Sequence, residues 1–231
     1  MAFTSEIRWI IMLCGLLLLI SSCSTAPGSS RSSGTGDSVG RDQSELVVDS
    51  TEESPRILRP NPYLENAPQI NRSVETSFDL GLAAMELENW PEAELIFQEL
   101  TVTEPRLSGP WVNLGIIYNQ AEKFESAESA WKTAIEVNPA NTDAYNHLAI
   151  LKREQGDFVA AEGFFLNSLA KWPDNPEAHC NLGILYDLYM GLWPQALAEY
   201  QECADLTEEP SRQLRGWIID MERRIQSQAT E

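Results

Sequence analysis

Histidine and positive charge are both scarce in this chain of 231 residues. It has two histidines, and its 16 lysines and arginines face 35 aspartates and glutamates, which leaves a formal net charge of −19. Nucleic-acid binding is excluded, because phosphates are neutralised by clustered lysine and arginine. Neither His147 nor His179 has a nucleophile at the spacing of a catalytic triad, so no enzymatic activity and no small-molecule substrate are expected. A protein partner with a neutral or basic surface suits this charge.

Cysteine is also sparse, and its positions do not predict a metal site. A structural site needs four convergent ligands, and His147, His179 and Cys180 fall short of that number. We therefore expect no metal and no other cofactor. Cys180 and Cys203 could form a disulfide if their Cα atoms lie within about 7 Å of each other. Two buried free thiols are the favoured interpretation.

Long apolar runs are missing apart from one near the N-terminus. Residues 9–20 are almost uninterrupted in their apolar character, but a confident transmembrane span needs about 20 residues. Arg8 precedes the run, and Ser21 and Ser22 follow it. This order of a positive residue, an apolar core and small residues is typical of a secretory signal.

A cysteine follows the small residues at once, and the segment from Ile20 to Cys23 resembles the lipobox of bacterial lipoproteins. The resemblance implies a signal peptide over residues 1–22 and a lipidated Cys23 as the first mature residue. Ser24, where aspartate would imply the inner membrane, implies a lipoprotein of the outer membrane that faces the periplasm of a Gram-negative bacterium. The alternatives are an ordinary signal cut near Ala26 and an uncleaved anchor.

The residues after the cysteine favour a tether over packed structure. Serine, glycine and threonine dominate as far as Gly40, and prolines such as Pro60 and Pro62 are predicted to prevent a regular helix. With the lipidated cysteine, the tether is expected to cover residues 23–72. Residues 57–64 are more apolar than their surroundings. They are either a solvated linker or a segment that lies in a groove of the folded domain, as extended ligands do.

From residue 74 onward the chain repeats with a period of 34 residues. The aligned columns hold leucine, a small residue, alanine, an aromatic residue and proline: Leu80, Leu114, Leu148 and Leu182; Gly81, Gly115, Ala149 and Gly183; Ala93, Ala127 and Ala161; Phe97, Trp131 and Phe165; Pro105, Pro139 and Pro173. In the fourth row Ala196 and Tyr200 come one residue late. The row that runs from Trp111 through Leu114, Gly115 and Tyr118 to Pro139 resembles the tetratricopeptide repeat.

This resemblance implies an all-α fold, a right-handed superhelical solenoid of four helix pairs within residues 73–210. The pairs are expected at 74–107, 108–141, 142–175 and 176–210. An apolar stripe in residues 211–231 predicts a C-terminal capping helix followed by a short tail. The leucine and small-residue columns are expected where the two helices of one pair meet, and the aromatic column between one pair and the next.

The first helices of the pairs are expected to form the concave surface that binds a protein or peptide. The residues expected on it are Phe78, Leu82, Val112, Asn113, Ile116, Asn119, Asn146, Ile150, Arg153, Asn181, Ile184 and Asp187. Asn113 and Asn181 share a column, and an amide offers a peptide backbone both a donor and an acceptor. A local bond on the helix surface is the alternative. Arg153 is the only cation of the set, so the carboxylate clamp of chaperone-binding family members is not expected.

Together these patterns predict a membrane-anchored adaptor or scaffold. It would bind an envelope protein or an extended peptide and assist a cell-envelope complex, such as pilus, secretion or cell-wall machinery. The alternative is a fixed structural subunit of an outer-membrane complex, whose groove is permanently filled. An obligate subunit is expected to expose a larger apolar patch than an adaptor does.

Overall fold

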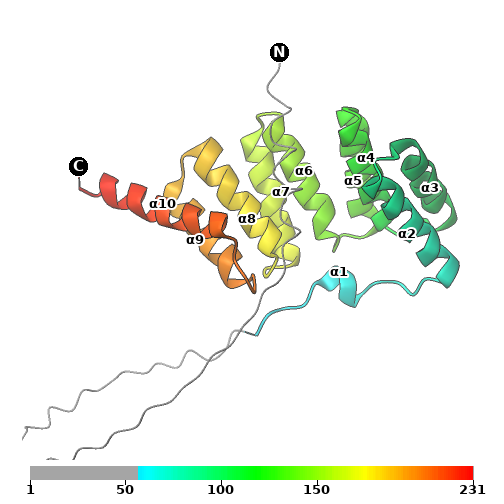
Figure 1. The fold of residues 1–231 in the computed structure, drawn as a ribbon, viewed down its shortest axis with the longest axis horizontal. Coiled ribbons are helices and arrows are strands. Elements are labelled where there is room, and N and C mark those ends of the chain that lie inside the picture. The colour runs from blue at the N-terminus through cyan, green and yellow to red at the C-terminus, as the bar shows by residue number, and fades with distance from the viewer. Residues whose placement is uncertain (1–56, 231) are drawn as a thin grey trace, which may run out of the picture. The chain divides into compact units, whose positions relative to one another are not determined.

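The computed structural model describes residues 57–230, and the expected signal peptide, Cys23 and most of the expected tether lie outside the described residues. Within that range every regular element is a helix (Figure 1). The elements are α1 (Pro62–Glu65), α2 (Arg72–Glu86), α3 (Trp90–Thr103), α4 (Gly109–Gln120), α5 (Phe124–Val137), α6 (Thr142–Glu154), α7 (Phe158–Lys171), α8 (Pro176–Leu185), the π-helix η2 (Tyr186–Met190), α9 (Trp193–Asp205) and α10 (Arg212–Gln228). None of the helices in this range is long and apolar enough to cross a membrane.

The longer helices form consecutive pairs. Helix α2 packs on α3, α4 on α5, α6 on α7 and α8 on α9, and each pair packs on the next. Helix α10 packs on α9, where Leu214 and Met221 are buried in the same core cluster as Tyr200. The predicted all-α solenoid of four helix pairs with a C-terminal capping helix is therefore confirmed.

Glycine lets an aromatic ring of the second helix lie against the backbone of the first helix in each of three pairs. A Cβ atom on Gly81 would lie 2.7 Å from Phe97 Cζ, and one on Gly183 would lie 2.6 Å from Tyr200 Cδ1. Gly115 lies under Trp131 in the same way. Real Cβ contacts are not this short, so a larger residue would overpack these pairs. These three pairs thus need glycine at this column for space rather than for backbone freedom.

The leucine column does not lie where the sequence predicted. Leu114 is 2% exposed and belongs to a cluster with Phe97 and Leu100 of the preceding pair. Leu80 holds the same position in the first pair but is 57% exposed. The expectation that this leucine fills the seam inside its own pair is wrong, because it packs each pair against the one before. Within residues 57–230 no helix pair precedes α2.

The extra residue in the fourth row is absorbed by a π-helix. Helix α8 passes directly into η2, whose end is closed by Gly191 in the left-handed conformation at φ 65°. The N–H of Leu192 then donates to the carbonyl of Tyr186 at 2.9 Å. Single π-turns are a common way for a helix to accommodate one inserted residue. As a result Ala196 and Tyr200 regain their places in the core.

A short helix, α1, lies in the stretch where proline was expected to prevent regular structure. Pro62 occupies its first turn, where the missing N–H is not needed. The side chain of Asn61 caps it by accepting a bond from the N–H of Tyr63 at 2.9 Å. The expectation therefore failed at this point, because proline opposes the interior of a helix and not its start.

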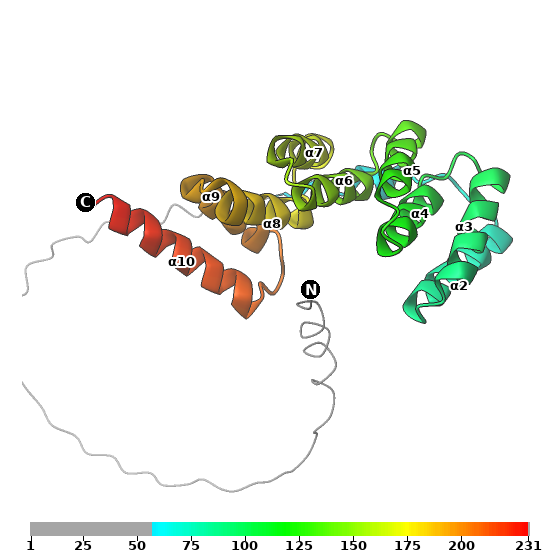
Figure 2. The ribbon, with the colours of Figure 1, turned by 90° about the horizontal axis from the view of Figure 1, so that it is seen from above.

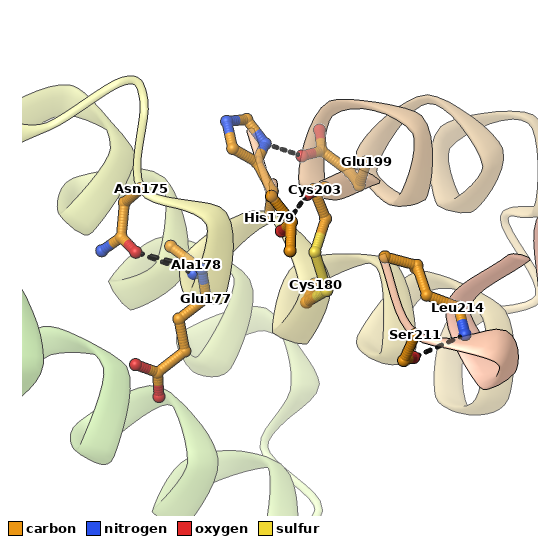
Figure 3. Close-up of a disulfide and its surroundings, with 10 residues drawn as sticks. Asn175, Glu177, Ala178, His179, Cys180, Glu199, Cys203, Ser211 and Leu214 are labelled. Atoms are coloured by element: carbon orange, nitrogen blue, oxygen red, sulfur yellow. Dashed lines mark hydrogen bonds and ion pairs between the residues drawn. A yellow bond between two sulfur atoms is a disulfide. The ribbon is translucent and has the colours of Figure 1, made fainter. Parts of the chain in front are cut away.

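A disulfide joins the two helices of the last pair (Figure 3). Cys180 on α8 and Cys203 on α9 have Cα atoms 5.3 Å apart and share a sulfur–sulfur bond. The favoured sequence interpretation, two free thiols, is therefore wrong. Figure 3 also shows the side chain of Ser211 accepting a bond from the N–H of Leu214, which caps α10 beside the disulfide.

Candidate functional site

The first helices of the pairs line a groove with a cavity of about 340 Å³. Figure 2 shows α4, α6 and α8 on the same side of their partners α5, α7 and α9. The groove is lined by Tyr63, Phe78, Gly109, Val112, Asn113, Ile116, Asn141, Asp143, His147 and Glu177. Four of these were expected on the concave surface from the sequence, namely Phe78, Val112, Asn113 and Ile116.

The sequence contained a signal for the groove residues that were missed. Asp143 and Glu177 occupy the same column of the 34-residue repeat as Gly109, and His147 occupies the column of Asn113 and Asn181. Extending the asparagine column to His147 would have found a third groove position. The change of residue type down each column concealed this shared location.

The two aligned asparagines, Asn113 and Asn181, lie in different surroundings. The Nδ2 of Asn113 donates to the carbonyl of Gly109 in its own helix at 3.0 Å, which is the local alternative left open by the sequence. Asn181 is half-buried on α8. For Asn113 one of the two amide N–H groups is thus used inside α4. The local bond uses neither its second N–H nor its Oδ1.

Three other expected residues carry buried polar atoms with no hydrogen-bond partner within the described part of the chain. They are Oδ1 of Asn119, both amide atoms of Asn146, and Nε and Nη1 of Arg153. Asn146 is 1% exposed. Buried polar groups are nearly always paired, so unpaired ones on the neighbouring helices α4 and α6 point to a polar ligand or ordered water there. The guanidinium of Arg153 is further held over the ring of Tyr189, at 5.7 Å from its centroid.

Asp187 serves the fold rather than the groove. Its carboxylate accepts from the hydroxyl of Tyr200 at 3.5 Å and pairs with Arg224 of α10 at 3.4 Å. Burial raises its pKa, while the nearby charge of Arg224 acts in the opposite direction. The expectation that Asp187 contacts a partner has to be corrected, because this side chain joins η2 and α9 to the capping helix.

The remaining expected residues are apolar. Leu82 on α2 is exposed, and Ile150 and Ile184 are half-buried and pack on the core cluster of the last two pairs. These three side chains can make apolar contacts with a ligand but no hydrogen bonds. Any recognition by direction or charge must therefore come from the polar residues of the groove.

The pKa values of three groove residues, Asp143, His147 and Glu177, are shifted toward the neutral form. Loss of water raises the pKa of Asp143, and loss of water together with the charge of Asp143 raises the pKa of Glu177. Burial lowers the pKa of His147 to about 4, and its ring stacks on Trp131 at a centroid distance of 5.2 Å. A positive group that entered the groove would relieve the repulsion between the two carboxylates.

A segment of the chain itself lies against the connection between α7 and α8 and reaches the groove. The N–H of Arg59 donates to Oδ2 of Asp174, and Nε1–H of Trp172 donates to the carbonyl of Arg59 at 2.8 Å. Further along, Tyr63 lines the cavity beside Phe78. Figure 1 shows the segment in cyan, passing from the side of α8 through α1 to α2. Of the two alternatives for residues 57–64, the contacts favour a segment that lies against the folded domain.

His179 has well-defined partners of its own. One ring nitrogen lies 2.6 Å from Oε2 of Glu199 (Figure 3), and the other lies 3.0 Å from the carbonyl of Pro173. Cys180 beside it is bound in the disulfide. Among residues 57–230, no group of three or more histidine, cysteine, aspartate and glutamate side chains is placed to hold a metal ion.

Comparison with known proteins agrees with this architecture. Residues 112–176 match the tetratricopeptide repeat family. Among solved structures, PilF of Pseudomonas aeruginosa is 16% identical, with 67% of this chain and 70% of that chain covered and a TM-score of 0.60. A thermophilic TPR protein of Thermus thermophilus, TTC0263, is 24% identical, with 69% and 84% covered and a TM-score of 0.55.

A fragment of MamA from Desulfovibrio magneticus RS-1 is 15% identical, with 70% of this chain and 90% of that chain covered and a TM-score of 0.55. At these identities the likeness shows the fold alone. Among curated proteins, none matches this chain. The family match and the structural neighbours support a tetratricopeptide-repeat protein, and such a fold implies a scaffold for protein–protein interaction.

Proposed function

We propose that this protein is a lipid-anchored adaptor of the bacterial envelope, which captures a protein or extended peptide in the groove formed by its first helices. The observation that carries the proposal is the set of unpaired buried polar atoms on the first helices α4 and α6, in Asn119, Asn146 and Arg153. Asn119 and Arg153 are half-buried, so their atoms would gain a partner if a peptide backbone or side chain lay against them. No part of the proposal requires catalysis, since tetratricopeptide-repeat proteins are typically adaptors without enzymatic activity.

The proposed compartment rests on two independent features. The lipobox-like segment that ends at Cys23 supports export and anchoring at the outer membrane. The disulfide between Cys180 and Cys203 supports an oxidising space such as the periplasm, because disulfides are rare in a reducing cytosol. Replacing Cys23 by Ala should release the protein from the membrane fraction. Retention of that variant after a high-salt wash would contradict the anchor.

A fixed structural subunit remains the second candidate, and one observation favours it. Leu80, Leu95 and Val102, on the two helices of the first pair, are all exposed. Exposed apolar side chains that gather on one helix pair are typical of a protein contact. In that role the first pair, rather than the groove, would hold the permanent neighbour.

The groove can be tested by capture from native envelope extract with the full chain as bait. Asp143→Asn with Glu177→Gln changes two groove carboxylates and should lose a specific partner, identified by mass spectrometry. The matched control is Glu125→Gln with Glu136→Gln, which makes the same change in charge at exposed positions of α5. Capture that is equal for both variants would place binding outside the groove. Loss with Leu80→Asp instead would favour the fixed subunit.

A further inference from the structure

The segment that reaches the groove through Tyr63 is held at Arg59 as a bound peptide would be. Both backbone groups of Arg59 are used, since its N–H donates to Asp174 and its carbonyl accepts from the indole of Trp172 at 2.8 Å. Two side chains, one a donor and one an acceptor, thus make the pair of backbone hydrogen bonds that a neighbouring β-strand would make. Backbone capture of this type binds an extended chain with little dependence on sequence.

The side chain of Arg59 adds a preference for positive charge. Its Nε lies 3.3 Å from Oδ2 of Asp174 and its Nη2 lies 3.5 Å from Oδ1, so the guanidinium faces both carboxylate oxygens. The carboxylate of Asp174 is 2% exposed, whereas the arginine side chain is 63% exposed. The receptor side of this contact is therefore built into the fold, and the ligand side approaches from solvent. Hydrogen bonds to a charged group are stronger than neutral ones.

Residues beyond Arg59 give the segment a stiff path and an aromatic end. Pro60 and Pro62 restrict the backbone, which lowers the entropy lost on binding. Helix α1 then places the half-buried ring of Tyr63 in the cavity, close to Phe78 and Gly109. A Cβ atom on Gly109 would lie 3.3 Å from the hydroxyl of Tyr63, so glycine leaves just enough room for this ring.

The receptor residues are specific to one repeat. Trp172 takes the column that holds Glu104 and Asn138 in the rows before it, and Asp174 takes the column of Arg106 and Ala140. The other described repeats thus lack this combination of an indole donor and a carboxylate. Since neither residue is required by the repeat pattern, the capture of Arg59 is specific to this repeat.

From these contacts we infer that the groove and the adjoining connection between α7 and α8 bind a peptide carrying an arginine followed four residues later by an aromatic residue in a helical turn, and that residues 59–63 of the chain are an internal copy of that ligand. Trp172 and Asp174 hold the arginine residue, and the cavity beside Phe78 takes the aromatic ring. This inference rests on the proposed adaptor function and names the chemistry of its partner. The internal copy competes with the partner, so partner binding is weaker while the segment is in place.

The test uses the full chain and a fluorescein-labelled peptide of residues 55–68, followed by fluorescence anisotropy. The double variant Arg59→Ala, Tyr63→Ala should empty the groove and bind the peptide saturably. Because a tethered segment has an effective concentration in the millimolar range, the unaltered chain should bind it about tenfold more weakly. Adding Asp174→Asn to the double variant should remove most of the binding, whereas adding Asp205→Asn on the exposed side of α9 should not.

A second peptide, with alanine at the positions of Arg59 and Tyr63, guards against a folding defect in the Asp174 variant. It should fail to bind the double variant. The inference would be overturned if both peptides bound equally well. It would also be overturned if the double variant and the unaltered chain bound the peptide equally, or if no binding were seen at all. Absent peptide binding with intact capture of an envelope protein would leave the proposed function standing. Peptide binding without any captured protein would count against the adaptor function and not against the site.

Discussion

The first and last helix pairs share one repeat pattern but differ in how far their outer faces are covered by other helices. In the first pair, Leu80 is 57% exposed, and no helix covers that face within the described residues. In the last pair, Leu182 is 0% exposed, a disulfide ties α8 to α9, and α10 packs over the outer side of α9. The same column of leucines therefore lies in the core at one end and at the surface at the other.

This difference shows that a repeat position has no fixed energetic value. Each pair in a solenoid contacts only its neighbours, so stability is close to a sum of the pairs and the interfaces between them. Leu182 contributes to an interface with the third pair, where it clusters with Phe165 and Ala161. Leu80 has no such interface among residues 57–230. The first pair is thus expected to be the least stable part of the described stack.

The largest effect that tests this comparison should come from shortening the two leucines. Leu182→Ala leaves a cavity between two pairs and should reduce the free energy of unfolding by about 3 kcal/mol. Leu80→Ala removes a side chain that is already mostly in water, and should cost less than about 1 kcal/mol. Urea unfolding monitored by far-ultraviolet circular dichroism would measure both. Similar losses for the two variants would contradict the assignment of this column to the interface with the preceding pair.

Removing the disulfide should have a slightly smaller and local effect. The cysteines are separated by 23 residues in sequence, and closing a loop of this length stabilises a fold by about 3 kcal/mol, with native-state effects commonly reducing that figure. Cys180→Ala with Cys203→Ala should therefore destabilise α8, α9 and α10. Hydrogen exchange of backbone amides would locate the change. Unchanged exchange in α2 and α3 is the expected internal control, and faster exchange there would show that the ends are coupled.

The contrast between the ends also explains what the sequence could predict. Columns such as Gly115 and Gly183 recur because each pair makes the same contact with its own aromatic ring, so the fold was predictable from periodicity. The exposure of Leu80 was not, since it depends on whether a helix pair precedes α2, and none does among residues 57–230. The disulfide depended on a distance between Cα atoms, which residue spacing does not supply.

The groove was predictable only in part for a related reason. Phe78 and Asn113 lie on it as the repeat register indicated. Asp143, Glu177 and His147 were missed because each replaces a different residue type in its column. Asp187 was placed there in error, since its partners Tyr200 and Arg224 come from α9 and α10. The 34-residue period could not predict the contact with α10, because the capping helix lies outside the repeats.

The smallest expected effect is a difference in how stability depends on pH at the two histidines of the chain. His147 lies in the groove, and His179 lies beside the disulfide. Burial lowers the pKa of His147 to about 4 from an ordinary 6.5. Between those values the unfolded chain binds a proton that the folded chain does not, so stability is lost as pH falls from 6.5 toward 4. His147→Gln should reduce this loss by about 2 kcal/mol at most, since the ring is partly exposed.

His179 should behave in the opposite sense. Burial would lower its pKa, but the bonds to Glu199 and to the carbonyl of Pro173 outweigh burial and raise it. Both partners are acceptors, so the doubly protonated ring fits best. Its contribution is complete below pH 6.5 and is lost as pH rises through the raised value. Proton NMR of the two rings would resolve the difference, because one resonance should titrate near pH 4 and the other above 6.5. Two rings that titrate together would contradict both environments, whereas a shift of the His179 transition alone in Glu199→Gln would assign its cause to that carboxylate.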